Sequence, residues 1–175
     1  MMMNEVSLAG LPKGFKRVLL AFLTTLTIGV TLGLGMVWMS TSGTADGLVS
    51  HYRGDDPATV EFIPEKYPMP IKELLITTHN HILSFTMIFG VLGVLIQYSR
   101  TLPSKWITFL SVEPFLSIVI TFGSMWGIRF IHDGFFWLML LSSSTLYLSF
   151  YTIIFIIIRE LRPFYGRSET GENQG

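Results

Sequence analysis

Cysteine is absent from the 175 residues, and charged residues make up only 14% of the chain. Without cysteine there is no disulfide framework, thiolate metal site, thiol nucleophile or covalent c-type haem attachment. A typical soluble domain carries about 25% charged residues. The low charge, with a mean hydropathy of +0.53, excludes a disordered chain, a collagenous chain and most soluble enzymes.

Neither sign of charge is in excess, because twelve basic residues balance twelve acidic ones. This balance argues against a nucleic-acid partner. The strings G-x-x-x-x-G-K-[ST], G-x-S-x-G and H-E-x-x-H are also absent. We therefore do not expect the chain to be a hydrolase, kinase or nucleotidase, or an enzyme on its own.

Four apolar runs dominate what is present, and each reaches the roughly 20 residues that a helix needs to cross a bilayer core. They lie at residues 18–39, 74–98, 106–130 and 135–158. Glycines and a proline inside them are tolerated, because helices in lipid re-satisfy freed backbone groups locally. The sequence predicts an all-α integral membrane protein, a four-transmembrane-helix up-down bundle.

The connecting segments are short, with one exception. We expect tails at 1–17 and 159–175, a loop at 99–105, a turn at 131–134 and a long outer loop at 40–73. The first run exceeds a secretory signal core of about 7–15 residues, so we expect it to remain as a span.

The long outer loop combines prolines with apolar and aromatic residues. Its prolines are Pro57, Pro64, Pro68 and Pro70. Proline favours extended or turn backbone. We expect an ordered cap over the bundle, with at most one short helix and a surface able to dock partners.

Basic residues are unevenly divided between the two sides of this bundle. Four lie on the side of the long loop, and eight lie on the side of the termini. The eight are Lys13, Lys16, Arg17, Arg100, Lys105, Arg159, Arg162 and Arg167. Because the richer side faces the cytoplasm, we predict both termini inside, in a bacterial inner membrane.

Each span carries a stripe of small and polar residues, the kind of surface through which helices associate in lipid. At about 100° per residue these stripes predict the inner faces. They comprise Thr24, Thr27, Thr31 and Gly35; His79, Thr86, Gly90, Gly93 and Gln97; Glu113, Ser117, Ser124 and Gly127; and Ser142, Thr145 and Ser149. Gly29 and Gly33 form a G-x-x-x-G pair on another face, typical of a close helix contact.

All four histidines fall on the predicted outer side. Neutral imidazole ligates haem iron, and b-type haem between membrane helices is commonly held by histidines of two helices. We predict His79 as the first axial ligand and His132 as the second, ahead of His81 and His51. Arg129 is the expected partner of a haem propionate or a lipid phosphate, or of Asp133.

Two other interpretations of the histidines stay open. A single metal ion bound by His79, His81 and His132 together would need an extended or distorted backbone around His79 and His81. Alternatively, the histidines have a structural role and make hydrogen bonds at the membrane interface.

Glu113 is the only carboxylate inside a span, about 10 Å from its cytoplasmic end by helix rise. A charge there is costly, so we expect it to be protonated or paired. One hypothesis is a carboxylate for proton relay or quinone binding. The other is an interhelical hydrogen bond to Gln97, Tyr151 or Thr24.

Three functions remain open at this stage. The first is a small membrane subunit of a redox or respiratory complex that binds b-type haem near the outer leaflet. This arrangement resembles, in general form alone, the small four-helix cytochrome b-type membrane subunits. The second is a cofactor-free structural or assembly subunit, and the third is a proton or ion conductor centred on Glu113. All three have the lipid bilayer as a partner, and the first two add membrane or periplasmic subunits in a homo- or hetero-oligomer.

Overall fold

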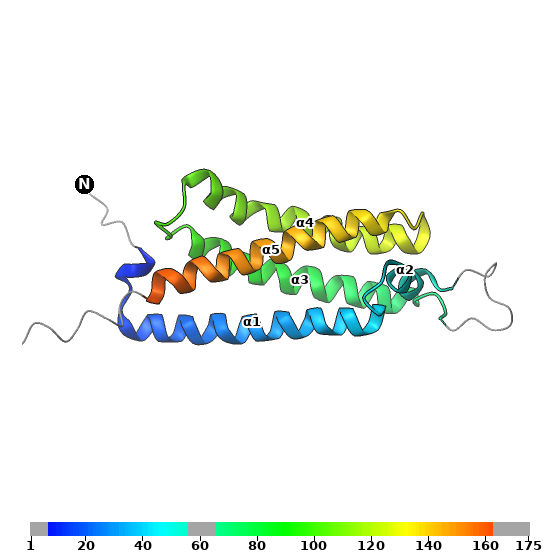
Figure 1. Ribbon diagram of the computed structural model, residues 1–175, viewed down its shortest axis with the longest axis horizontal. Helices are drawn as coiled ribbons and strands as arrows, with labels where there is room; N and C mark the ends of the chain where they lie inside the picture. Colours follow the sequence, from blue (N-terminus) through cyan, green and yellow to red (C-terminus); the bar gives the residue numbers. More distant parts are fainter. Residues whose placement is uncertain (1–6, 56–65, 163–175) are drawn as a thin grey trace, which may run out of the picture.

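The computed structural model describes residues 7–55 and 66–162 (Figure 1). A short 3-10 helix, η1 (Leu8–Gly10), precedes the first long helix. The helices that follow are α1 (Lys13–Thr41), α2 (Ala45–Arg53), α3 (Ile71–Ile96), α4 (Ser104–Phe130) and α5 (Phe135–Leu161). No strand occurs among these described residues. The predicted all-α fold is confirmed, and four of the helices are long and apolar enough to cross a membrane.

The four long helices run alternately up and down, so the described ends of α1 and α5 lie at one end of the bundle (Figure 1). The short helix α2 lies at the opposite end, within the loop where one short helix was predicted. The part of that loop with Pro57 and Pro64 falls outside the described residues, as does the tail after Arg162.

Proline sets the start of three long helices. Pro12, Pro70 and Pro103 stand immediately before α1, α3 and α4, each with φ between −61° and −56° and an extended ψ. Proline has no N–H to donate and disfavours helix for the residue before it, so each of these helices begins sharply. In α2 the start is a side-chain cap, because the Thr44 hydroxyl accepts from the Gly47 N–H at 3.0 Å.

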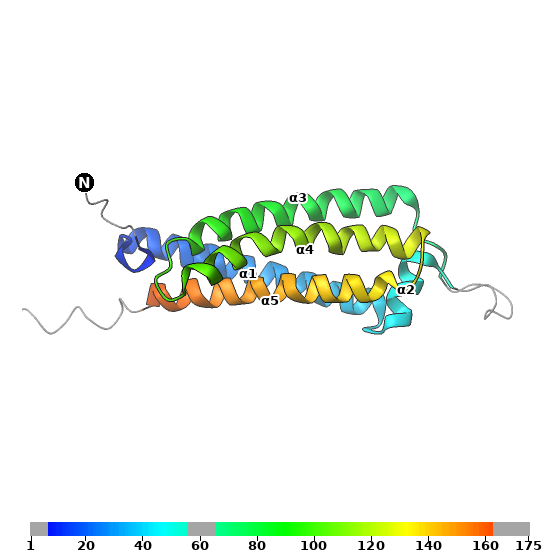
Figure 2. The ribbon, with the colours of Figure 1, turned by 90° about the horizontal axis from the view of Figure 1, so that it is seen from above.

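Helices α4 and α5 form the closest pair, and α3 packs against α4 (Figure 2). Their buried apolar residues include Phe89, Ile118, Phe122, Phe150 and Ile153. In the most apolar stretch of α5, 44% of residues are buried, against only 11% in α1. The bundle is therefore a tight unit of three helices with a loosely attached fourth.

Helix α1 lies on the side of α3 and α5 away from α4 (Figure 1). Leu19 and Leu23 are its buried apolar residues. Near mid-span, the Thr31 hydroxyl and the Tyr151 phenol join α1 to α5 at 2.9 Å. The predicted stripe of α1 is otherwise wrong, because Thr24 and Gly35 are exposed.

The outer loop is tied to the ends of the bundle by polar contacts. Arg53 of α2 pairs with Asp133 in the α4–α5 turn at 2.6 Å. Arg129 donates through Nε to the Met69 carbonyl at 3.3 Å. The predicted Arg129–Asp133 pair is therefore wrong, because the loop brings Arg53 to Asp133 and Met69 to Arg129.

A substitution at Gly127 tests how closely α4 packs against α5 next to the turn that joins them. A Cβ atom placed there would lie 2.4 Å from the ring of Phe135, whereas a Cβ at Gly123 meets nothing within 4 Å. Gly127→Ala is expected to destabilise the protein by about 1–3 kcal/mol through overpacking. Gly123→Ala should leave it unchanged or stabilise it, since alanine favours helix. Thermal unfolding in mild detergent measures both, and equal effects would contradict this packing.

Candidate functional site

A cavity of about 1000 Å³ lies between α1 and the three-helix unit. Helices α1, α3, α4 and α5 provide its walls, and α2 provides residues at the outer end. Its lining is mostly aliphatic and aromatic, including Phe22, Phe85, Phe122 and Phe136. Volume and lining match the concave, largely apolar sites that hold small molecules and cofactors.

Two glycines of α1 leave room in the middle of the cavity wall. Gly29 and Gly33 line it, and a Cβ at either position would meet nothing within 4 Å. The predicted close helix contact through this G-x-x-x-G pair is therefore wrong. The two glycines widen the space instead of bringing two helices together.

A few polar side chains converge on this apolar space. They are Thr25, Ser40, His51, Tyr52, Thr77, His81, Ser84, Thr121, Ser143, Ser144 and Tyr147. Apolar walls with a small number of placed polar groups fix the orientation of a bound molecule. Two of the four histidines of the chain thus face one cavity.

His81 is held in a defined position by its own helix and by aromatic rings. Its Nδ1 lies 2.8 Å from the Thr77 carbonyl, so Nδ1 carries the proton and donates. The imidazole packs on Phe122, with ring centroids 5.3 Å apart, and on Phe85. In this tautomer the lone pair of Nε2 is available to ligate a metal.

His51 approaches the same cavity from α2. Its ring packs edge-on against Tyr52 at 5.0 Å. Burial and the positive charge of Lys66 lower the pKa of His51, which favours the neutral imidazole that binds metals. Burial also raises the pKa of Tyr52 to about 12, so its phenol stays protonated.

The two histidines predicted as axial ligands lie elsewhere. His79 is exposed on α3 and does not line the cavity. His132 is exposed in the α4–α5 turn, where its Nδ1 accepts from the Gly134 N–H at 2.8 Å. Neither predicted ligand therefore faces the cavity, which His81 and His51 line instead.

The reason lies in how α3 packs. Its buried face is made of Leu74, Phe89, Leu92 and Ile96, large apolar residues that fit against the bundle. The outer half of the predicted polar stripe, with His79 and Thr86, is exposed. At the other end the stripe does meet α4, because Gln97 donates to Ser111 at 2.8 Å.

A mononuclear site of three histidines is not assembled. In the part of the chain that the structure describes, no group of three or more His, Asp or Glu side chains is placed to hold a metal ion. On a regular helix the side chains of His79 and His81 diverge by about 200°. The helix stays regular there, which separates them.

A second polar feature runs between α4 and α5 and is called here the hydroxyl seam: Glu113, Ser117, Thr121, Ser142, Thr145 and Ser149. Glu113 accepts from Ser117 one turn along α4 and from Ser149 of α5 at 2.7 Å. The Ser117 and Thr145 hydroxyls lie 2.9 Å apart, and those of Thr121 and Ser142 lie 2.8 Å apart. The stripes predicted on these two helices therefore do face each other.

The predicted partners of Glu113 are wrong. Gln97 bonds Ser111, and Tyr151 bonds Thr31, so neither reaches the carboxylate. Serines of the two adjoining helices satisfy Glu113 instead, which lets a carboxyl group lie at membrane depth. The seam and the cavity touch at one residue, Thr121, which belongs to both.

Comparison with known proteins places the chain in a family. The Aq_1264_TM family, a transmembrane helical domain, matches residues 42–163, more than half of the chain. The chain belongs to this family of membrane domains. The match covers α2 to α5 and begins where α1 ends, so it coincides with the tight helices and their cap. No curated protein and no solved structure matches the chain.

The seam predicts a graded response at Glu113. Glu113→Ala removes both acceptors and should lower stability by about 1–3 kcal/mol, because the α4–α5 hydroxyls lose a buried partner. Glu113→Gln keeps one acceptor oxygen and should cost less than half as much. Unfolding in mixed detergent micelles measures the difference. If the two variants are equally stable, hydrogen bonding at Glu113 does not hold α4 to α5.

The lowered pKa of His51 predicts that the stability of the protein depends on pH. Its folded pKa lies below the ordinary value of 6.5, so the unfolded chain binds the proton more readily. Stability should fall as the pH drops below about 6.5 and level off below the folded pKa. His51→Gln should flatten this slope, measured as thermal midpoints between pH 7.5 and 5. His79→Gln is the matched control, and an unchanged slope in His51→Gln would contradict the assignment.

Proposed function

We propose that this membrane protein is a small redox subunit that binds b-type haem in the cavity beneath α1, with His81 and His51 as its axial ligands. The observation that carries the proposal is that both histidines line one largely apolar cavity of about 1000 Å³. Helix-borne histidines facing an apolar space between membrane helices are the usual setting for such a haem.

The donor set fits this cofactor. His81 donates Nδ1–H to a backbone carbonyl, the contact that orients a metal-binding imidazole and raises its basicity. His51 is held in its neutral form by burial and by Lys66. Aromatic rings at Phe85, Phe122 and Tyr147 provide flat apolar walls. When bound, haem supplies one-electron transfer, which no side chain of this chain provides.

The charges near the outer end also suit the cofactor. Lys66 lies close enough to His51 to lower its pKa, and its Nζ donates to Ser50 at 3.2 Å. A cation at this position is a suitable partner for a propionate. Arg129, the partner predicted from the sequence, bonds the Met69 carbonyl instead. Neither Lys66 nor Arg129 is among the residues that line the cavity, so a propionate would reach Lys66 at its outer edge.

The two alternative functions have less support. A conductor centred on Glu113 would need the carboxylate to exchange protons along a path, but both its oxygens accept hydrogen bonds within a tightly packed pair of helices. A cofactor-free assembly subunit explains the exposed apolar surface of α1 but gives no role to the cavity or its histidines.

Reduced-minus-oxidised absorbance spectra of the purified protein test the proposal. The parent should show Soret and α bands of a b-type haem, and His81→Ala should lose them. His51→Ala should retain haem with weaker binding or altered bands, because one ligand remains. His79→Ala, two residues away on the same helix, should match the parent.

Folding of each variant is checked by size-exclusion chromatography and helical circular dichroism, with His81→Gln as a second variant. A folded parent without haem bands, purified from cells supplied with haem, would overturn the proposal. If His79→Ala loses haem and His81→Ala keeps it, the axial ligand is His79, as predicted from the sequence.

A further inference from the structure

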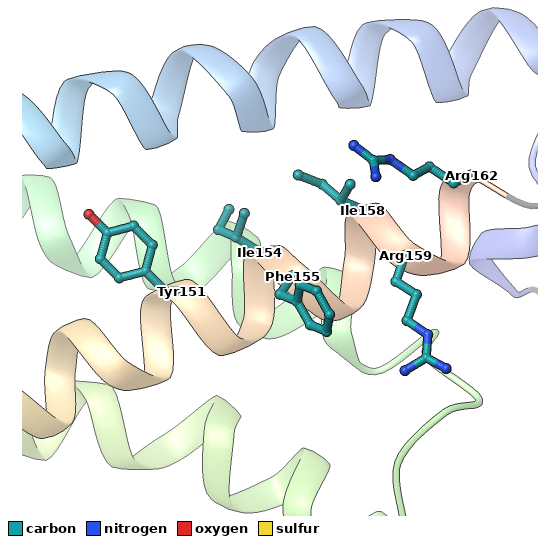
Figure 3. Close-up of a pocket in the computed structure, with 6 residues that line it drawn as sticks. All are labelled: Tyr151, Ile154, Phe155, Ile158, Arg159 and Arg162. Carbon is teal, nitrogen blue, oxygen red and sulfur yellow. The ribbon is translucent and has the colours of Figure 1, made fainter.

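A second hollow, of about 730 Å³, lies on α5 near the end of the bundle that holds the termini. All the residues that line it belong to α5 and its C-terminal flank. Figure 3 shows Ile154, Ile158 and Arg162 on the side of α5 that faces α1, with Phe155 and Arg159 pointing away from it. Together the lining residues form a strip that runs from the phenol of Tyr151, past Ile154, Phe155 and Ile158, to Arg159 and Arg162. It is apolar along its length and strongly basic at one end.

In the part of the chain that the structure describes, no carboxylate neutralises either arginine. Within the described residues, Arg159 and Arg162 have no ion-pair partner, and the ion pair Arg53–Asp133 lies at the other end of the bundle. Glu160 stands between them in the sequence, but its carboxylate accepts from Ser99, Thr101 and the Arg100 backbone N–H. The two guanidinium groups are therefore available to an outside anion.

The length of the strip matches one leaflet of a bilayer. Tyr151 and Arg162 are eleven residues apart, or about 16 Å along a helix. A hydrocarbon core is about 30 Å thick, so the strip covers about half of it. A transmembrane partner helix would need a strip across the whole core, whereas one lipid molecule fits this one.

We propose that this strip, named here the α5 lipid groove, binds one anionic phospholipid. The phosphate accepts charge-assisted hydrogen bonds from Arg159 and Arg162. An acyl chain lies along Ile158, Phe155 and Ile154 toward Tyr151. The exposed fraction of the Phe155 side chain, 65%, shows how much apolar surface is left for that chain to cover. This proposal is independent of haem binding at the other cavity.

Lipid-dependent thermal stability tests the groove. Purified protein, stripped of lipid in detergent, is titrated with phosphatidylglycerol or with phosphatidylcholine of the same acyl chains. Phosphatidylglycerol should raise the unfolding temperature saturably, and phosphatidylcholine should do so weakly. Arg159→Gln with Arg162→Gln should weaken the apparent affinity about tenfold or more, the effect of losing a hydrogen bond to a charged group.

Matched variants separate the groove from general charge and from free anions. Arg17→Gln removes a basic residue of α1 at the same end of the bundle and should bind lipid like the parent. Phe155→Ala, at an exposed position, should weaken binding while leaving the fold intact. Glycerol phosphate alone should give no stabilisation, because it lacks the acyl chain.

Several results would overturn the proposal. One is equal stabilisation by the two lipids, and another is an equal loss in Arg17→Gln. Stabilisation by glycerol phosphate alone would make the arginines a simple anion site. Native mass spectrometry gives a last check. If it shows a dimer of the chain with no lipid bound, the occupant of the groove is a second copy of the chain.

Discussion

The contact between α4 and α5 is the constraint on which the other features depend. In lipid, helices gain little by burying apolar surface against each other, so close packing and polar contacts hold them together. Here those contacts are the hydroxyl seam, in which Glu113 joins Ser117 and Ser149, and Thr121 faces Ser142. The seam fixes two helices in register. Helix α3 packs against this pair, and next to the connecting turn the Phe135 ring of α5 packs closely on Gly127 of α4.

Helix α1 is packed less tightly than the other three long helices. It is attached by the Thr31–Tyr151 bond, two buried leucines and the cap helix α2. The space left between α1 and the three-helix unit is the large cavity. The family match follows the same division, because it covers α2 to α5 and leaves out α1. The molecule thus combines a tightly packed membrane domain with a fourth long helix that forms one wall of the cavity.

Hydropathy and spacing were sufficient to predict the four helices, because a membrane span is defined by composition over about 20 residues. They also predicted the facing stripes of α4 and α5, where Glu113, Ser117, Thr145 and Ser149 meet. They failed on α3, because Phe89 and Leu92 pack inward while His79 stays outside. Thr77, His81, Phe85 and Ile88 are spaced as one helix face and line the cavity, a face that the sequence-based predictions missed. Pairings such as Arg53 with Asp133 depend on how the loop folds back, which spacing does not encode.

The central claim is that the space beneath α1 is a cofactor site in which His81 is a ligand. An experimental structure of the protein, purified from its own membrane and crystallised in a lipidic phase, tests it most directly. The account predicts flat, planar density in the cavity, continuous with Nε2 of His81 and bounded by Phe85 and Phe122. Two results would contradict the proposal. One is a collapsed cavity in which α1 packs onto α3, and the other is acyl-chain density in the cavity that makes no bond to the His81 imidazole.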